Sequence, residues 1–236
     1  MSGFKVFLEA TATNPFLSKF YKEPKRYALR MQIWLLKHRY NTYYQALKEM
    51  ESSGKGVILD RSIFSDFVFA KKNLVDGNIS KEGFDKYFEL RRKMLSTVPR
   101  PDLMIFLDVN SKECHRRIHE IRKREAEVSS GIPIEYLQGL EECYKELLIE
   151  MESSGTRIGR LDWNNFGQVD QFFEKIRHFH PDKKLEWISN DGEFKRLIEY
   201  SVNPEWTADY HDLNIQVDHE LDKEREAHKR ELLSQK

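Results

Sequence analysis

Hydrophobic residues in this chain form short apolar runs that alternate with longer segments in which apolar positions recur at helical spacing. The short runs predict strands at Phe4–Leu8, Val57–Leu59 and Leu103–Leu107, and Arg157–Leu161 is a further strand candidate. The helical spacing predicts helices over residues 24–54, 63–74, 81–95, 110–117, 133–155 and 169–179. Strands that alternate with long helices are typical of an α/β fold, with a parallel sheet flanked by helices in three α/β/α layers.

Polar residues stand where two of these strands end. Glu9 follows the first strand, and Asp60–Ser62 follows the second. The carboxyl ends of parallel strands are where open α/β sheets bind ligands. On the long helix, Gln32 and Arg39 are seven positions apart and therefore share a face. With the arginine-rich segment 117–124, these groups indicate a site for a polar ligand that carries phosphate.

The sequence contains no Gly-x-x-x-x-Gly-Lys-Ser/Thr phosphate loop. Its nearest candidate is Gly54-Lys55-Gly56. Glu49 stands where the first glycine is required, and Gly56 stands where a hydroxyl residue is required. Gly54 is better interpreted as the end of the preceding helix.

Composition narrows the class of protein. The chain has 236 residues, with 39 basic and 39 acidic side chains, so a broad basic surface for a nucleic acid polymer is not expected. Its two cysteines lack metal-ligand spacing, and no segment has the pattern of a secretory signal or a membrane span. We therefore expect a cytoplasmic protein, or a mitochondrial one if an upstream presequence is missing.

Three separate segments resemble the deoxynucleoside kinases: NPFLSKFYKEPKRYALRMQIWLLKHRY, VILDRSIFSDFVFA and RRIHEIRKREAE followed by GIPIEYL. Their order and spacing extend the resemblance over about residues 4–180. The resemblance implies a nucleoside kinase fold and, in nucleotide salvage, phosphoryl transfer from ATP with Mg²⁺ to a deoxynucleoside 5′-hydroxyl. Residues 1–180 then form the kinase-like domain. Residues 181–236 form an extension that ends in a charged helix or a disordered tail.

The resemblance also implies the residues of catalysis and of donor binding. Glu9 matches the general base that accepts the hydroxyl proton. Asp60 matches a Mg²⁺ ligand, and Arg61 matches a group that neutralises the transferred phosphoryl charge. The lid arginines that close over the donor phosphates are matched by Arg117, Arg122 and Arg124.

Substrate-binding residues follow in the same way. Gln32 matches the amide that recognises the base edge, and Phe69 matches an aromatic residue that stacks on the base. Arg39 and Asp66 match an ion pair over the base, which favours purine or deoxycytidine over thymidine. The pair that hydrogen-bonds the sugar 3′-hydroxyl is matched by Tyr21 and Glu127. Taken singly each residue has an ordinary structural interpretation, and for Phe69 and Glu127 that interpretation weighs about as much as ligand binding.

The sequence leaves three hypotheses for the function of the protein. In the first, the chain is a deoxynucleoside kinase truncated before its first strand and phosphate loop, and is therefore catalytically poor and marginally stable. In the second, it is a pseudokinase that binds nucleoside or serves as a structural subunit, as one respiratory complex I relative does. The third is a thymidylate-kinase-like nucleoside monophosphate kinase. The family resemblance also suggests a homodimer.

Overall fold

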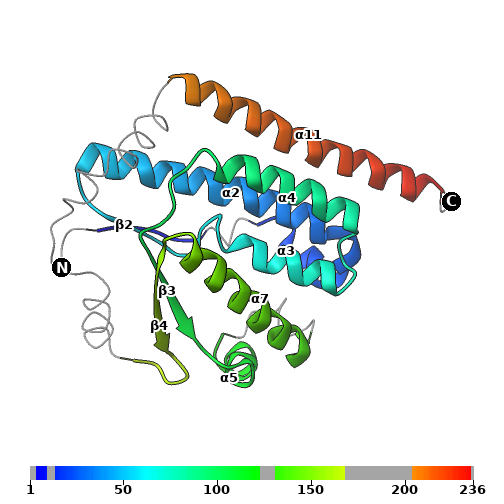
Figure 1. Cartoon of the computed structure of the whole chain (residues 1–236). Coiled ribbons are helices and arrows are strands. Elements are labelled where there is room, and N and C mark those ends of the chain that lie inside the picture. Colours follow the sequence, from blue (N-terminus) through cyan, green and yellow to red (C-terminus); the bar gives the residue numbers. More distant parts are fainter. Residues whose placement is uncertain (1–3, 10–13, 123–130, 168–203, 235–236) are drawn as a thin grey trace. The chain divides into compact units, whose positions relative to one another are not determined.

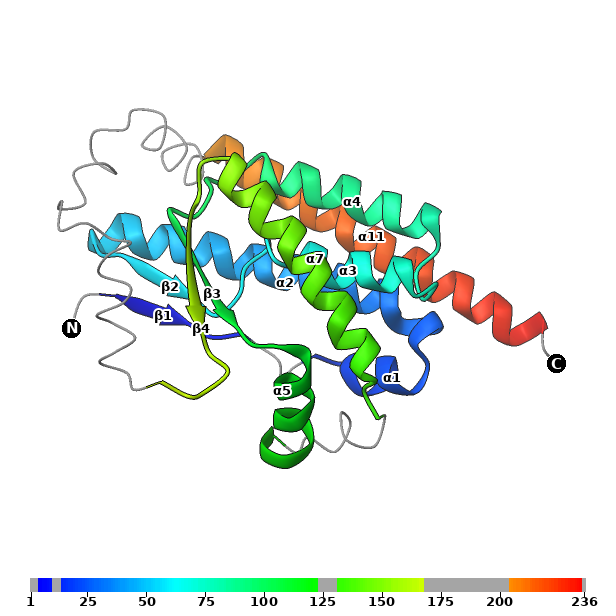
Figure 2. The ribbon, with the colours of Figure 1, turned by 60° about the horizontal axis from the view of Figure 1, so that its bottom comes forward.

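A computed structural model describes residues 4–9, 14–122, 131–167 and 204–234. The chain divides into two compact units (Figure 1). Unit 1 comprises Met1–Pro99 and Arg196–Lys236, and unit 2 comprises Arg100–Lys195. Each unit contains one pair of parallel strands (Figure 2). The predicted α/β class with parallel strands is therefore confirmed.

Unit 1 holds two of the predicted strands, β1 (Lys5–Phe7) and β2 (Val57–Leu59). They pair in parallel, with Lys5 opposite Val57 and Phe7 opposite Leu59. The N–H of Asp60 donates to the Phe7 carbonyl at 2.8 Å, so the pairing continues to the residue after β2. This register fixes the backbone beside Glu9 and Asp60, where the site lies.

Helix α2 (Pro24–Ser53) is the longest contiguous element of the amino-terminal part of unit 1. Pro24 stands in its first turn, where a missing N–H costs no hydrogen bond. Gly54 ends the helix at φ +65°, a left-handed conformation that glycine adopts without strain, and its N–H donates to the Met50 carbonyl at 2.9 Å. The predicted span 24–54 is confirmed.

Three further helices pack around α2: α1 (Leu17–Lys22), α3 (Asp66–Val75) and α4 (Lys81–Leu95). Their shared core includes the fully buried side chains of Leu36, Tyr40 and Met94. Helix α4 begins and ends as predicted. Helix α3 begins at Asp66 rather than residue 63 because Ser62 to Ser65 form a turn, in which the Ser65 N–H donates to the Ser62 carbonyl at 3.1 Å.

Helix α11 (Pro204–Ser234) belongs to the same unit and runs antiparallel to α2 (Figures 1 and 2). The side chain of Val217 is fully buried, and Asp218 forms an ion pair with Lys37 of α2. The charged carboxyl-terminal segment therefore forms a helix, which was one of the two alternatives considered, the other being a disordered tail. Its packing against α2 and α4 was not predicted.

Unit 2 contains β3 (Leu103–Asp108) and β4 (Arg157–Asp162), which pair in parallel along their whole length. Helix α5 (Ser111–Arg116) follows β3 and continues as a π-helix, η1 (Arg117–Arg122). The predicted cap at Asn110 is confirmed, since its Oδ1 accepts from the Glu113 N–H at 2.9 Å. Helix α7 (Ile134–Ser153) then leads to β4.

Other predictions fall outside the described residues: the loop at 123–130, the helix at 169–179 and the domain boundary at residue 180. Among the described helices, none is long and apolar enough to cross a membrane.

The partly buried carboxyl group of Asp102, just before β3, should make the stability of unit 2 depend on pH. Burial raises its pKa from 3.8 to about 6, and Arg157 opposes part of that shift. Because the folded pKa lies above the unfolded value, protonation favours the folded state. We expect the free energy of unfolding contributed by this group to rise as the pH falls from about 7 to about 4.

The Asp102→Asn variant removes this titration and is expected to be more stable than the parent chain at pH 7, with the difference shrinking toward pH 4. Urea unfolding across that pH range measures it. Asp108→Asn, at the exposed end of β3, is the matched control. If the free energy of unfolding depended on pH in the same way for the parent chain and for Asp102→Asn, a raised pKa of Asp102 would be contradicted.

Candidate functional site in unit 1

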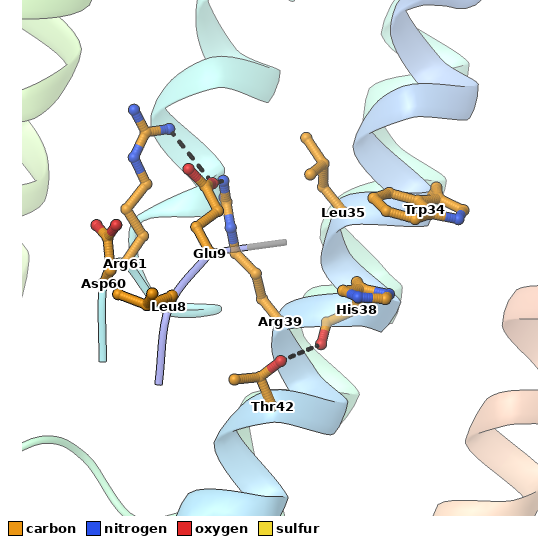
Figure 3. Close-up of a pocket in the computed structure, with 9 residues that line it drawn as sticks. All are labelled: Leu8, Glu9, Trp34, Leu35, His38, Arg39, Thr42, Asp60 and Arg61. Atoms are coloured by element: carbon orange, nitrogen blue, oxygen red, sulfur yellow. Dashed lines mark hydrogen bonds and ion pairs between the residues drawn. The ribbon is translucent and has the colours of Figure 1, made fainter. Parts of the chain in front are cut away.

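The ends of β1 and β2 open onto a small pocket against one face of α2 (Figure 3). Glu9 and Asp60 follow these two strands, as the sequence pattern predicts, and Arg61 stands next to Asp60. The pocket is lined by Leu8, Glu9, Trp34, Leu35, His38, Arg39, Thr42, Asp60 and Arg61. The strand-end charges and the α2 guanidinium are thus brought together.

Arg39 is the centre of the charged cluster. Its guanidinium forms ion pairs with Glu9 and with Asp66, and all three side chains are buried or nearly so. Arg61 adds a second positive charge, with Nη1 3.8 Å from Oε1 of Glu9. Because Glu9 follows β1 and Asp66 begins α3, the Arg39 side chain joins a strand end to two helices. Figure 3 shows the Glu9 carboxylate between the two guanidinium groups.

Arg61 has an unusual backbone. Its φ of +64° makes it the single non-glycine residue with positive φ in the part of the chain that the structure describes. Such a conformation is strained for a residue with a Cβ. The Arg61 guanidinium lies over the ring of Phe69, 4.7 Å from its centroid.

Gln32 is fully buried on α2, about two turns before Arg39. Neither Nε2 nor Oε1 of its amide has a hydrogen-bond partner among the described residues. A buried amide without partners is costly, and such groups call for an explanation. An amide presents one donor side and one acceptor side in a plane, which suits the edge of a nucleobase.

The wall of the pocket includes residues that the sequence analysis did not assign to the site. Trp34 and His38 stack with ring centroids 4.6 Å apart, and Thr42 donates to the His38 carbonyl at 3.0 Å. Trp34, His38 and Thr42 are spaced four residues apart, and this spacing could have indicated that they share one face of the helix. Tyr21 is not among the described lining residues; it packs beside Phe20, 5.4 Å between ring centroids.

Unit 2 holds the described part of the predicted lid. Arg117 pairs with Glu113 at 2.7 Å, donates to the Trp163 carbonyl at 2.7 Å, and lies over the Phe166 ring. Hydrogen bonds from Arg116 and then Arg117 lower the pKa of Glu113 to about 2. Arg117 therefore ties η1 to the segment after β4. Arg122 ends η1, whereas Arg124 and Glu127 lie outside the described residues.

Asp60 is the exposed carboxylate of the site. The described ranges contain no cluster of three or more His, Cys, Asp or Glu side chains arranged to hold a metal. Mg²⁺ is commonly held by one or two carboxylates together with substrate phosphates. A single exposed carboxylate beside an arginine therefore fits a Mg²⁺ that arrives with a phosphate ligand.

The chain is similar to known proteins in sequence and in fold. A model of the family described as deoxynucleoside kinase matches residues 1–180. A deoxyguanosine kinase of Dictyostelium discoideum is 52% identical over 176 residues, which cover 75% of this chain and 61% of that protein. A deoxyadenosine kinase of the same organism is 32% identical, over 72% of this chain and 66% of that protein.

A protein named as subunit 10 of the mitochondrial NADH dehydrogenase 1 alpha subcomplex of Rattus norvegicus is also similar in sequence: it is 33% identical, over 71% of this chain and 53% of that protein. Among solved structures, a deoxyadenosine kinase from M. mycoides with bound dCTP is 25% identical with a TM-score of 0.61, over 75% of this chain and 85% of that one.

The fold is that of a nucleoside kinase-like α/β protein. The chain belongs to the deoxynucleoside kinase family. It spans between about half and two thirds of the length of the curated relatives named above.

The Arg39 cluster predicts a specific pattern of stability. Arg39→Met leaves the fully buried Asp66 and the nearly buried Glu9 without their shared partner. We expect a loss of about 3–5 kcal/mol in the free energy of unfolding, since breaking a buried ion pair leaves an uncompensated charge.

The double variant Arg39→Met/Asp66→Leu should recover part of that loss, because it removes one of the two buried carboxylates left without a partner. Urea unfolding compares the variants. Arg92→Met, at an exposed arginine of α4, controls for loss of a guanidinium. A cost for Arg39→Met no larger than for Arg92→Met would contradict the central role of this side chain.

Proposed function

We propose that unit 1 binds a deoxynucleoside and that the protein is a kinase that phosphorylates the 5′-hydroxyl of that nucleoside, with ATP as donor. Family membership supports the reaction class. The observation that carries the proposal within this chain is the buried amide of Gln32, whose two polar atoms have no partner among the described residues. A nucleobase would supply both the donor and the acceptor that this amide lacks.

The charged cluster supports roles in phosphoryl transfer. Glu9 is the general base for the 5′-hydroxyl, since its carboxylate ends β1 beside the pocket. Arg61 lies close to that carboxylate and would neutralise charge on the transferred phosphoryl group. Asp60 would hold Mg²⁺, which supplies charge neutralisation at the donor phosphates. The proposed lid residues are Arg117, Arg122 and Arg124.

The substrate is proposed to be a purine deoxynucleoside or deoxycytidine rather than thymidine. The buried ion pair between Arg39 of α2 and Asp66 of α3 lies at the pocket wall that Arg39 forms, and supports this preference. Relatives named as deoxyguanosine and deoxyadenosine kinases, and a deoxyadenosine kinase structure with bound dCTP, support this range. Tyr21 and Glu127 are proposed to contact the sugar 3′-hydroxyl. Phe69 is proposed to flank the base site.

A structural role is the competing hypothesis, because one similar protein is named as a subunit of NADH dehydrogenase. Such a role would require no Glu9 carboxylate beside Arg61, yet these groups lie 3.8 Å apart at the pocket. We therefore favour the kinase, acting in nucleotide salvage in the cytoplasm or in mitochondria, and as a homodimer.

Gln32→Leu tests the proposal with two opposite effects. Loss of the base-recognising amide should weaken deoxyguanosine or deoxyadenosine binding by about 1–3 kcal/mol, which is about 5- to 150-fold in Kd. The same change removes an unpartnered buried amide, so the free energy of unfolding without ligand should increase by about 1 kcal/mol. Calorimetry measures the first effect and urea unfolding the second.

Gln45→Leu, at an exposed glutamine of the same helix, should change neither quantity by more than about 0.5 kcal/mol. Equal affinity for the parent chain and Gln32→Leu, or no binding of any deoxynucleoside to the parent chain, would contradict the proposed site.

Turnover is expected to be slow for a protein that consists of these 236 residues. No phosphate loop occurs in them, so no lysine and amide cradle of that motif stabilises the donor phosphates. By analogy with lost oxyanion donors, the rate should be about 10³-fold or more below that of a kinase that carries the loop. Assays with ATP, Mg²⁺ and each deoxynucleoside measure the rate, and brisk turnover would overturn this expectation.

A further inference from the structure

We propose that His115 and His119 form a two-histidine site for a divalent transition-metal ion such as Zn²⁺, with water completing the coordination. The pair lies within unit 2, where helix α5 meets the π-helix η1. Neither histidine lines the pocket of unit 1. The proposal therefore stands independently of the proposed function.

The two imidazole rings are close enough to share one ion. Their centroids are 4.2 Å apart and their planes are inclined by 33°. Residues four positions apart are neighbours on a helix surface. Two imidazole nitrogens bound to one Zn²⁺, each at about 2.0–2.1 Å, lie about 3–3.5 Å from each other. Small side-chain rotations bring rings at this distance to that separation, and both side chains are only half-buried, so an ion can reach them.

One ring is already oriented as a metal ligand. Nδ1 of His119 lies 2.9 Å from the carbonyl oxygen of His115. Because a carbonyl oxygen can only accept a hydrogen bond, Nδ1 is the nitrogen that carries the proton. In the neutral ring the free lone pair then lies on Nε2. Metal-binding histidines commonly donate from their second nitrogen to a carbonyl or carboxylate, which fixes the ring.

The other ring has no competing hydrogen bond. Among the described residues, the His115 ring contacts the His119 ring and makes no hydrogen bond of its own. Its nitrogens can therefore bind an ion without breaking a contact that the fold requires.

The charges around the pair are balanced. Arg116 and Arg117 stand between the two histidines and would repel a cation if they were unpaired. Both form ion pairs with Glu113 at 2.7 Å, and Arg116 also pairs with Glu120 at 2.8 Å. Two carboxylates thus offset two guanidinium groups, so the local charge does not oppose a divalent ion.

The position of the pair in the fold is an independent observation. Helix α5 ends at Arg116 and the π-helix η1 begins at Arg117, so each histidine comes from a different kind of helix. π-Helices are rare and frequently occur at functional sites. A bound ion would tie α5 to η1, the segment that carries Arg117 and Arg122.

The donor set indicates the class of ion. Imidazole nitrogen suits Zn²⁺, Ni²⁺ and Cu²⁺, whereas Mg²⁺ prefers oxygen ligands. No third His, Cys, Asp or Glu of the described residues joins the pair in a metal-binding group. Two protein ligands leave coordination positions open to water, so we expect an exchangeable ion rather than a closed structural site.

Competition against a coloured zinc chelator measures the Kd of the full chain for Zn²⁺. Both histidines hold the same ion, so His115→Gln and His119→Gln should each raise the Kd about tenfold or more. The double variant should lose little beyond either single variant, since one remaining histidine no longer chelates. An excess of Mg²⁺ should leave the Kd unchanged.

His219→Gln is the matched control, because His219 is an exposed histidine of α11 in unit 1. This variant should bind Zn²⁺ as tightly as the parent chain. Urea unfolding of each variant distinguishes loss of the site from loss of the fold.

Nuclear magnetic resonance of the parent chain gives a second measurement that does not depend on how a variant folds. Zn²⁺ should shift two imidazole Hε1 signals together, and these should be the signals that disappear in His115→Gln and His119→Gln. Equal Kd values for the parent chain and the double variant, or shifts confined to other histidines, would overturn the proposal. A loss of affinity in only one single variant would also overturn it, since it would indicate a single histidine ligand.

Discussion

The buried guanidinium of Arg39 is the interaction on which unit 1 depends. It bridges the carboxylate after β1 and the carboxylate that begins α3, while its own backbone lies in α2. Charges at such depth are tolerated only when they are paired, so the three elements are obliged to meet at one point. The ion pairs therefore hold the strand end that carries Glu9 at a fixed distance from α2, and the pocket lies in the space between them.

Around this ion-pair cluster, the site contains features that a protein optimised only for stability would not keep. The Gln32 amide is buried without partners among the described residues, and Arg61 has a strained backbone. Each costs free energy in the unliganded chain; Arg61 lines the pocket, and Gln32 lies on α2, the helix that supplies one wall of it. The contacts of α2 with α1, α3, α4 and α11 stabilise unit 1 and offset these costs.

The parts of the fold that depend on local pattern could be predicted from sequence. Helix α4 and the long α2 have clear apolar periodicity and end signals, and β1, β2 and β3 lie in short apolar runs. The signal for β4 is weaker, because its sequence RIGRLD contains two arginines. Glu9 and Asp60–Arg61 could be placed because polar groups at strand ends share an edge. The Arg61–Phe69 contact could not, since it depends on a backbone conformation that no residue type signals. The packing of α11 was missed because its apolar stripe is too thin to recognise: of the α11 side chains that the structure describes, Val217 alone is buried.

Unit 1 is assembled from two distant segments, and this has a consequence for how the protein is made. The ion pair between Lys37 and Asp218 joins residues 181 positions apart, with all of unit 2 encoded between them. At about 5–20 residues per second, a ribosome needs on the order of 10–40 s to reach Asp218 after it has added Lys37. During that interval α2 and α4 lack the helix that covers them, whereas unit 2 can already be complete. Unit 1 therefore begins to emerge first and finishes last, and its exposed α2 face is the surface that a chaperone would meet during synthesis.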